Sequence, residues 1–162
     1  MKAVAISGSP RSPSKSRALA ELALRVLTER GEEGRLIDLA ALPAEALLGR
    51  AQSPELEEAT SAVAESDVLI AATPTYRALY TGLLKCFFDL MPPAYLAGKR
   101  CIGLQTGIAA EHALSPEYGL RPLFASLDCI TSAVLYARDD EFENGVPGEA
   151  LTERVRSVLL SY

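Results

Sequence analysis

The sequence predicts an α/β fold in which a parallel sheet of five strands lies between helices on both faces. Short apolar segments typical of strands alternate with segments whose apolar residues recur at helical spacing. Residues 67–73 contain Val-Leu-Ile-Ala-Ala, which is apolar on both faces and typical of an interior strand of a parallel sheet. The 162 residues are predicted to form a single domain, because domains usually hold about 100–200 residues.

The first three elements are predicted to be a strand, a helix and a strand. Residues 2–7 are apolar and include two β-branched residues, as strands often do. Residues 14–30 are predicted to form a helix, because four of their apolar residues lie at helical spacing. These residues are Leu19, Leu22, Ala23 and Val26. Residues 35–39 form the second predicted strand, and residues 40–53 are expected to be irregular.

The next three elements are predicted to be a helix, an interior strand and a helix. Ser53 is suited to cap a helix over 53–66, because a proline and then a glutamate follow it in the first turn. The apolar strand 67–73 comes next. A helix over 81–91 then ends at Pro92-Pro93, since proline cannot continue a helix.

The last four elements are a strand over 99–105, a helix over 115–127, a strand over 130–136 and a helix over 147–162. The carboxyl ends of parallel strands meet at one edge of a sheet, and ligands bind there where the strand order reverses. Candidate site residues are therefore expected directly after the first, third and fourth strands.

Composition excludes several classes of protein. Sixteen Lys and Arg against 21 Asp and Glu give a net charge of −5, without the basic stripe of a nucleic-acid-binding protein. No apolar run reaches the roughly 18 residues of a membrane span, and Gly8 and Pro10 come too early for a signal peptide, so a soluble cytoplasmic protein is expected. With three cysteines outside any CxxC motif and one histidine, we expect buried thiols and no metal site.

The loop after the first strand is rich in serine. It reads Ser7-Gly8-Ser9-Pro10-Arg11-Ser12-Pro13-Ser14-Lys15-Ser16 and opens a helix, whose N-terminus suits a phosphate. The glycines of the P-loop and of GxGxxG are missing, so the loop favours a terminal monophosphate over a pyrophosphate or triphosphate. The alternative interpretation is a solvated turn ahead of an ordinary capped helix.

The loops after the third and fourth strands carry aromatic residues and a glycine. Pro74, Tyr76 and Tyr80 offer a shaped backbone and flat faces that suit a planar heterocycle, although the tyrosines would also serve to cover the sheet edge. Gly107 permits a close approach of the backbone to a ligand, and no acid–base role is assigned to His112.

Carboxylates near these loops carry no predicted role. Asp139-Asp140-Glu141 is expected to be a solvated stretch, and no nucleophile or pair of catalytic carboxylates accompanies the loops. A site for a phosphate and a planar ring without acid–base groups indicates a redox cofactor, which supplies the chemistry itself.

The three loops, taken in order, resemble those of the flavodoxin-like NAD(P)H-dependent FMN reductases, and the resemblance extends from Met1 to about residue 140. Ser7-Gly8-Ser9-Pro10-Arg11 resembles the FMN-phosphate loop, and Thr73-Pro74-Thr75-Tyr76 resembles the second loop. Thr106-Gly107, His112 and Tyr118-Gly119-Leu120-Arg121-Pro122 are similar to the branch that supplies reduced flavin to alkanesulfonate monooxygenases. Ile108 departs from that branch, which usually has a second glycine there.

The resemblance implies a flavodoxin-like three-layer sandwich that transfers a hydride from NADPH or NADH to FMN. It also implies a homodimer or homotetramer, a flavin-dependent monooxygenase as partner, and a π-helical bulge at Tyr118 in the subunit interface. No catalytic side chain is implied, because the cofactor supplies the chemistry. The implied cofactor-binding residues are Ser9, Arg11, Ser14, Lys15, Ser16, Pro74, Thr75, Tyr76, Thr106 and Gly107.

Two other functions remain open from the sequence. One is a reductase that retains FMN and passes electrons to a quinone, an azo compound or a metal oxyanion, which tight retention of FMN through purification would favour. The other is a non-enzymatic flavodoxin-like electron carrier, which an absence of nicotinamide oxidation would favour.

Overall fold

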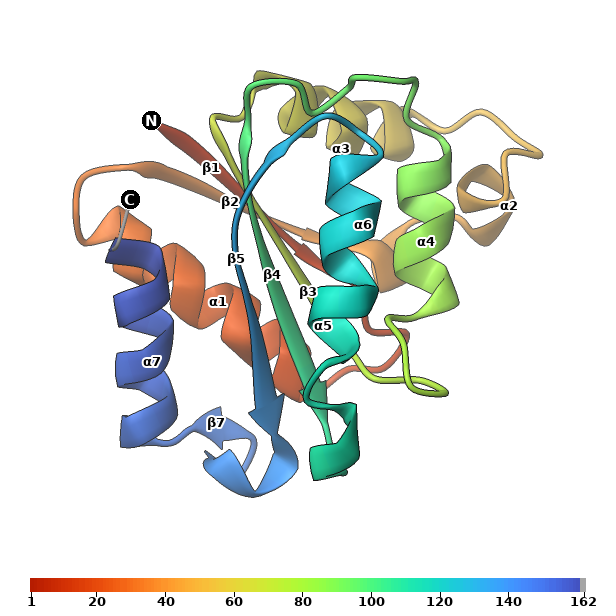
Figure 1. Cartoon of the computed structure of the whole chain (residues 1–162). Coiled ribbons are helices and arrows are strands. Elements are labelled where there is room, and N and C mark those ends of the chain that lie inside the picture. Colours follow the sequence, from red (N-terminus) through yellow and green to blue (C-terminus); the bar gives the residue numbers. More distant parts are fainter. Residues whose placement is uncertain (161–162) are drawn as a thin grey trace.

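The computed structural model describes residues 1–160, and its centre is a five-stranded sheet in the order β2-β1-β3-β4-β5 (Figure 1). All neighbouring strands are parallel. The strands are β1 (Lys2–Ser7), β2 (Glu33–Asp38), β3 (Val68–Pro74), β4 (Arg100–Gly107) and β5 (Ile130–Arg138). The predicted fold is confirmed, and every predicted strand is found with ends shifted by at most two residues.

Helices cover both faces of this sheet (Figure 1). They are α1 (Lys15–Thr28), α2 (Ala44–Leu47), α3 (Pro54–Glu65), α4 (Gly82–Asp89), α5 (Ser115–Tyr118), α6 (Leu120–Ala125) and α7 (Glu149–Leu160). Ser53 caps α3 as predicted, because its hydroxyl accepts a hydrogen bond from Leu56 N at 3.3 Å. The last two residues of the predicted helix 147–162 lie outside the described residues.

The remaining elements are short. They are the 3-10 helices η1 (Leu39–Ala41), η2 (Ala110–His112) and η3 (Asp139–Glu141), and the two-residue strands β6 (Phe142–Glu143) and β7 (Val146–Pro147). The segment 40–53, which was expected to be irregular, therefore contains η1 in part and the single turn of α2.

The predicted helix 115–127 is wrong in one respect, because the chain forms two helices that separate at Gly119. Pro122 has no N–H to donate to the carbonyl of Tyr118, so the hydrogen-bond ladder is interrupted there. A Cβ on Gly119 would lie 2.7 Å from Leu79 Cδ1 and 3.0 Å from Ser115 O, so a larger residue there would force Leu79 in the turn 76–79 to shift away from this break. Tyr118 is the last residue of α5, directly before this break, and the π-helical bulge expected there stays a prediction.

Two apolar clusters hold the layers together. On one face, α1 and α7 pack against the sheet through residues such as Leu19 and Val155. On the other face, α3, α4 and α6 contribute residues such as Phe87 and Phe124. Burying side chains of this size stabilises a fold by roughly 1.5–3 kcal/mol each.

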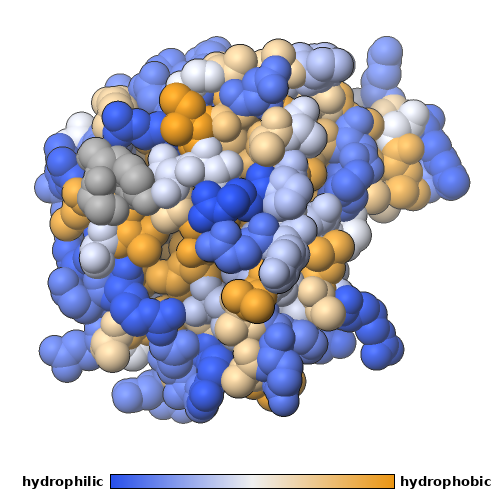
Figure 2. Space-filling model, viewed as in Figure 1, coloured by the Kyte–Doolittle hydropathy of each residue, from blue (hydrophilic) through white to orange (hydrophobic). Residues whose placement is uncertain are grey.

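Of the three cysteines, Cys101 is fully buried as expected, whereas Cys86 and Cys129 are only half-buried. The face that carries α7, the edge strand β5 and α6 mixes polar and apolar surface (Figure 2). Within residues 1–160, no helix combines the length and the apolar composition that crossing a membrane requires.

Candidate functional site

A cavity of about 400 Å³ opens at the carboxyl ends of the strands. The strand order reverses between β1 and β3, which is the position where this class of sheet binds its ligands. Nine residues predicted to bind the cofactor line the cavity, namely Ser9, Arg11, Ser14, Lys15, Pro74, Thr75, Tyr76, Thr106 and Gly107. The sheet therefore brings together three loops that are far apart in the sequence.

The loop after β1 is held at its base by the neighbouring strand and helix. Gly8 N donates to Ala72 O at 2.8 Å, and Thr81 Oγ1 donates to Gly8 O at 2.6 Å. Beyond this point, Ser9 Oγ accepts a hydrogen bond from Arg11 N at 3.1 Å, so a buried hydroxyl sets the direction of the loop.

The same loop ends in the cap of α1. Ser14 Oγ accepts from Arg17 N at 3.2 Å and lies 2.8 Å from Ser16 Oγ. Ser16 is buried and does not line the cavity. Its hydroxyl contacts that of Ser14 and so supports Ser14 from within the protein. Because the first N–H groups of a helix lack partners within the helix, this N-terminus attracts an anion.

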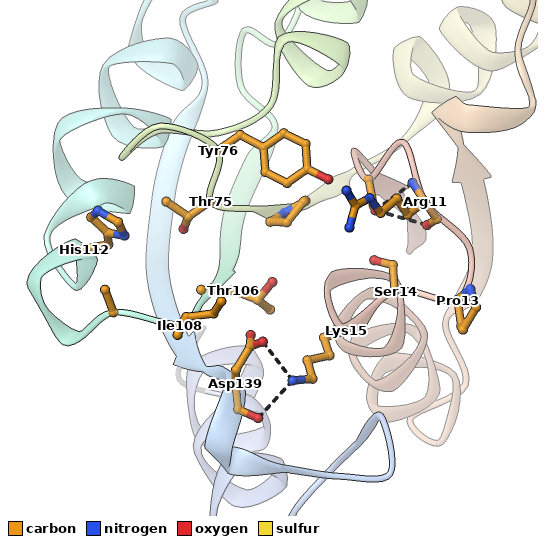
Figure 3. Close-up of a pocket in the computed structure, with 14 residues that line it drawn as sticks. Arg11, Pro13, Ser14, Lys15, Thr75, Tyr76, Thr106, Ile108, His112 and Asp139 are labelled. Carbon is orange, nitrogen blue, oxygen red and sulfur yellow. Dashed lines mark hydrogen bonds and ion pairs between the residues drawn. The ribbon is translucent and has the colours of Figure 1, made fainter.

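Arg11 adds a positive charge beside this helix end. Its side chain is exposed, and the Tyr76 hydroxyl points toward it across the cavity (Figure 3). A guanidinium binds phosphate oxygens with charge-assisted hydrogen bonds, which are stronger than neutral ones. The cavity thus has one end that is suited to a phosphate.

A tight turn carries Tyr76 at the other end of the cavity. Tyr76 N donates to Leu79 O at 2.8 Å, and the two residues between them, Arg77 and Ala78, have positive φ values of 52° and 66°. This left-handed conformation costs about 1–2 kcal/mol for each non-glycine residue. Ser115 Oγ stabilises the turn by donating to Ala78 O at 2.8 Å.

Gln105, on β4, links this turn to the sheet. Its side chain is fully buried, and its Nε2 donates to Thr75 Oγ1 at 2.9 Å and to Ser115 Oγ at 2.7 Å. Its Oε1 has no hydrogen-bond partner within residues 1–160. Gln105 therefore positions Thr75, which lines the cavity, together with the turn that Ser115 holds.

Tyr136 supports the backbone that follows β4. Its hydroxyl donates to Ala109 O at 2.8 Å, and burial raises the pKa of Tyr136 above the usual phenol value, so this donor keeps its proton near neutral pH. A Cβ on Gly107 would lie 2.4 Å from Tyr136 Oη and 2.9 Å from Thr75 Oγ1. Only glycine lets the backbone lie this close to both hydroxyls.

Five residues that line the cavity were not predicted to bind the cofactor. They are Pro13, Ile108, Ala109, His112 and Asp139. Asp139 corrects the expectation of a solvated acidic stretch, because it forms an ion pair with Lys15 at 2.9 Å. Its position directly after β5 could have indicated this, since β5 ends at the same edge of the sheet as β1, β3 and β4.

Tyr118 lies outside the cavity. Its side chain is 76% exposed, and the neighbouring Leu114 is 59% exposed. The interface predicted for Tyr118 stays a prediction, as does the binding role of each residue that lines the cavity.

Comparisons with known proteins agree with this geometry. The profile of the family described as NADPH-dependent FMN reductase matches residues 1–141. The chain belongs to this family. An FMN reductase (NADPH) from Pseudomonas putida is 38% identical over all of this chain and 86% of its own length, and the NADH-dependent FMN reductase SfnF from Pseudomonas fluorescens is 35% identical over 96% and 87%.

The family also accounts for the fold. A solved NADH:FMN oxidoreductase, EmoB in its apo form, superposes with a TM-score of 0.87 at 38% identity, over 98% of this chain and 86% of that one. The predicted family, the flavodoxin-like fold and the predicted use of FMN with a nicotinamide nucleotide are thereby confirmed.

Proposed function

We propose that residues 1–162 act as one FMN-binding domain that reduces FMN with NADPH or NADH. The observation that carries this proposal is the cavity at the strand ends, which joins a cationic helix N-terminus to an aromatic, glycine-containing wall. Its volume of about 400 Å³ lies within the roughly 300–1,000 Å³ typical of sites for small molecules. The residues present therefore fit a molecule with a phosphate at one end and a planar ring at the other.

The loop after β1 would hold the phosphate. Arg11 would contribute charge, Ser9 and Ser14 would contribute hydroxyl groups, and Ser16 would keep Ser14 in place through the contact of their hydroxyls at 2.8 Å. Lys15 would bring a second positive charge, which its ion pair with Asp139 offsets in part. Hydrogen bonds from Arg11 N and Arg17 N already hold the hydroxyls of Ser9 and Ser14 in place, so these two groups would need little ordering on binding.

The loops after β3 and β4 would hold the ring. Pro74, Thr75 and Tyr76 would edge it on one side, with Thr106 and Gly107 on the other. When bound, FMN supplies a ring that accepts a hydride from the nicotinamide, so no side chain of the cavity is required to transfer it. The protein's own contribution is to orient the two rings and to limit the access of water.

We also propose that the reduced flavin passes to a flavin-dependent monooxygenase. The sequence resemblance to reductases of alkanesulfonate monooxygenase systems supports this partner. A second copy of the chain is a further proposed partner, supported by the exposed apolar side chains of Leu114 and Tyr118 on and beside α5. Exposed apolar groups that lie close together often mark protein interfaces.

The rate of NADPH or NADH oxidation by the purified protein, measured with and without free FMN, tests the proposal. If FMN binds and leaves as a substrate, the rate of oxidation should depend on added FMN and reach a maximum as its concentration rises. We expect this result. A rate that is independent of added FMN, with flavin retained through purification, would instead identify a reductase with a resident cofactor. No oxidation with either nucleotide in the presence of FMN would contradict the enzymatic proposal.

A further inference from the structure

The two cations of the loop after β1 lie in different surroundings. Within residues 1–160, Arg11 forms no ion pair, and its guanidinium is open to an anion. Lys15 Nζ lies 2.9 Å from Asp139 Oδ2 and also donates to Asp139 O at 3.1 Å. One of the two positive charges is therefore already neutralised by a carboxylate of the protein.

The ion pair lies in the cavity wall and is partly screened from solvent. The side chains of Lys15 and Asp139 are 33% and 36% exposed, and both line the cavity (Figure 3). The ammonium also lies 5.6 Å from the centre of the Phe142 ring, a distance suited to a cation–π interaction. Lys15 thus has a well-defined position next to Ser14, and Asp139 is held there from the end of β5.

From this geometry we propose that Asp139 competes with the terminal phosphate of FMN for Lys15, and that it thereby determines how tightly the protein holds phosphorylated flavin. The inference rests on the proposed function. A phosphate seated at the N-terminus of α1 would either take Lys15 from Asp139 or lie beside a carboxylate of the same charge. Both outcomes weaken the binding of the phosphate, since like charges disfavour one another at short range.

This competition suits a protein that releases its flavin after reducing it. Arg11 and the helix N-terminus would recognise the phosphate, and Asp139 would prevent Lys15 from adding its full attraction. The carboxylate would act only on ligands that carry the phosphate, because the ring end of the cavity is formed by other residues. FMN and riboflavin, which share the ring but not the phosphate, therefore separate the two contributions.

The test is the affinity of Asp139→Asn for FMN and for riboflavin, measured by flavin fluorescence. We expect FMN to bind about threefold to fivefold more tightly than to the unmodified protein, the range that a partly exposed ion pair allows, and riboflavin to change by less than about twofold. Asp140→Asn is the matched control. It removes the same charge one residue away, where the carboxylate pairs with Arg138 and does not line the cavity.

A double-mutant cycle distinguishes competition from simple repulsion. If Asp139 acts through Lys15, the gain from Asp139→Asn becomes much smaller in a Lys15→Met background. Asp139→Ser serves as a second variant in case the amide perturbs folding, and thermal unfolding of each variant checks that the chain remains folded. Inorganic phosphate, tested as a competitor of FMN, should compete more strongly with Asp139→Asn than with the unmodified protein.

Three results would overturn the inference: no change in FMN affinity in both Asp139 variants, an equal gain for riboflavin, or a gain that persists in full without Lys15. The proposed function fails differently, because an unmodified protein that binds neither flavin contradicts it directly. Binding of both flavins with no effect at Asp139 would leave the proposed function intact and reject only the competition.

Discussion

The two ends of the cavity are built in different ways. At the phosphate end, beyond the anchor at Gly8, the hydrogen bonds that shape the loop join residues two or three positions apart, such as Ser9 with Arg11 and Ser14 with Arg17. At the ring end, Gln105 bonds to Thr75, which is 30 positions away, and Tyr136 bonds to Ala109, which is 27 positions away. Beyond that anchor and the ion pair of Lys15 with Asp139, the phosphate end is a local structure, whereas the ring end exists only when β5 and the loops after β3 and β4 come together.

This difference predicts how each end responds to mutation. A change at the phosphate end should alter recognition of the phosphate and leave the ring contacts intact. A change at the ring end should disturb several loops at once, because each loop holds the next. FMN and riboflavin distinguish the two cases, since riboflavin lacks the phosphate.

Gly107→Ala should have the largest effect. The new Cβ would lie 2.4 Å from Tyr136 Oη and 2.9 Å from Thr75 Oγ1, so the backbone or both hydroxyls must move. Overpacking of this kind costs about 1–3 kcal/mol of folding stability. We expect FMN and riboflavin both to bind more than about tenfold more weakly, measured by flavin fluorescence together with chemical unfolding.

Gly82→Ala is the control for this substitution. Gly82 begins α4, and a Cβ there meets nothing within 4 Å. Its variant should bind both flavins as the unmodified protein does. If Gly107→Ala behaves in the same way, the close packing of the three loops does not determine the ring end.

Arg11→Ala should affect the phosphate end alone. Charge-assisted hydrogen bonds contribute about 1–3 kcal/mol, so FMN affinity should fall by roughly fivefold to more than a hundredfold, while riboflavin affinity stays unchanged. Arg30→Ala, an exposed arginine beyond the opposite end of α1, is the control for loss of charge. Unchanged FMN affinity in Arg11→Ala would contradict the proposal that this loop binds the phosphate.

The same division explains how much could be predicted from the sequence. The strands and most helices follow from local patterns, and an anion site could be predicted in the serine-rich loop because its capping residue and its charges are sequence neighbours. Asp139 was missed, because its partner Lys15 lies 124 positions away. The turn at Arg77 and Ala78 was also missed, since neither residue favours a positive φ and the turn depends on Ser115.

Tyr136→Phe should have a smaller effect than Gly107→Ala. It removes one hydrogen bond, to Ala109 O, without changing the shape of the side chain. The net contribution of such a bond is about 0.5–1.5 kcal/mol, so FMN and riboflavin affinities should fall together by about twofold to tenfold. Both flavins are expected to respond equally, because Tyr136 supports the ring end alone.

Tyr95→Phe provides a matched control for Tyr136→Phe. Its hydroxyl donates to Thr60 O at 3.0 Å, on a side of the molecule that does not line the cavity. Both variants should lose similar folding stability, but only Tyr136→Phe should lose flavin affinity. A loss confined to FMN would show that Tyr136 acts on the phosphate end, and the two ends of the cavity would then not respond separately to mutation.

Ile108→Ala should have the smallest effect, although Ile108 occupies the position where the related branch usually has glycine. Its side chain is 84% exposed and lies at the rim of the cavity, so it contributes little packing within the protein. Exposed substitutions of this kind usually change stability by less than about 0.5 kcal/mol, and we expect the affinities for both flavins to stay within about twofold. A much larger gain in affinity for both flavins would show that this side chain crowds the ring. Exposed rim residues would then determine the ring end together with the buried hydrogen bonds of Gln105 and Tyr136.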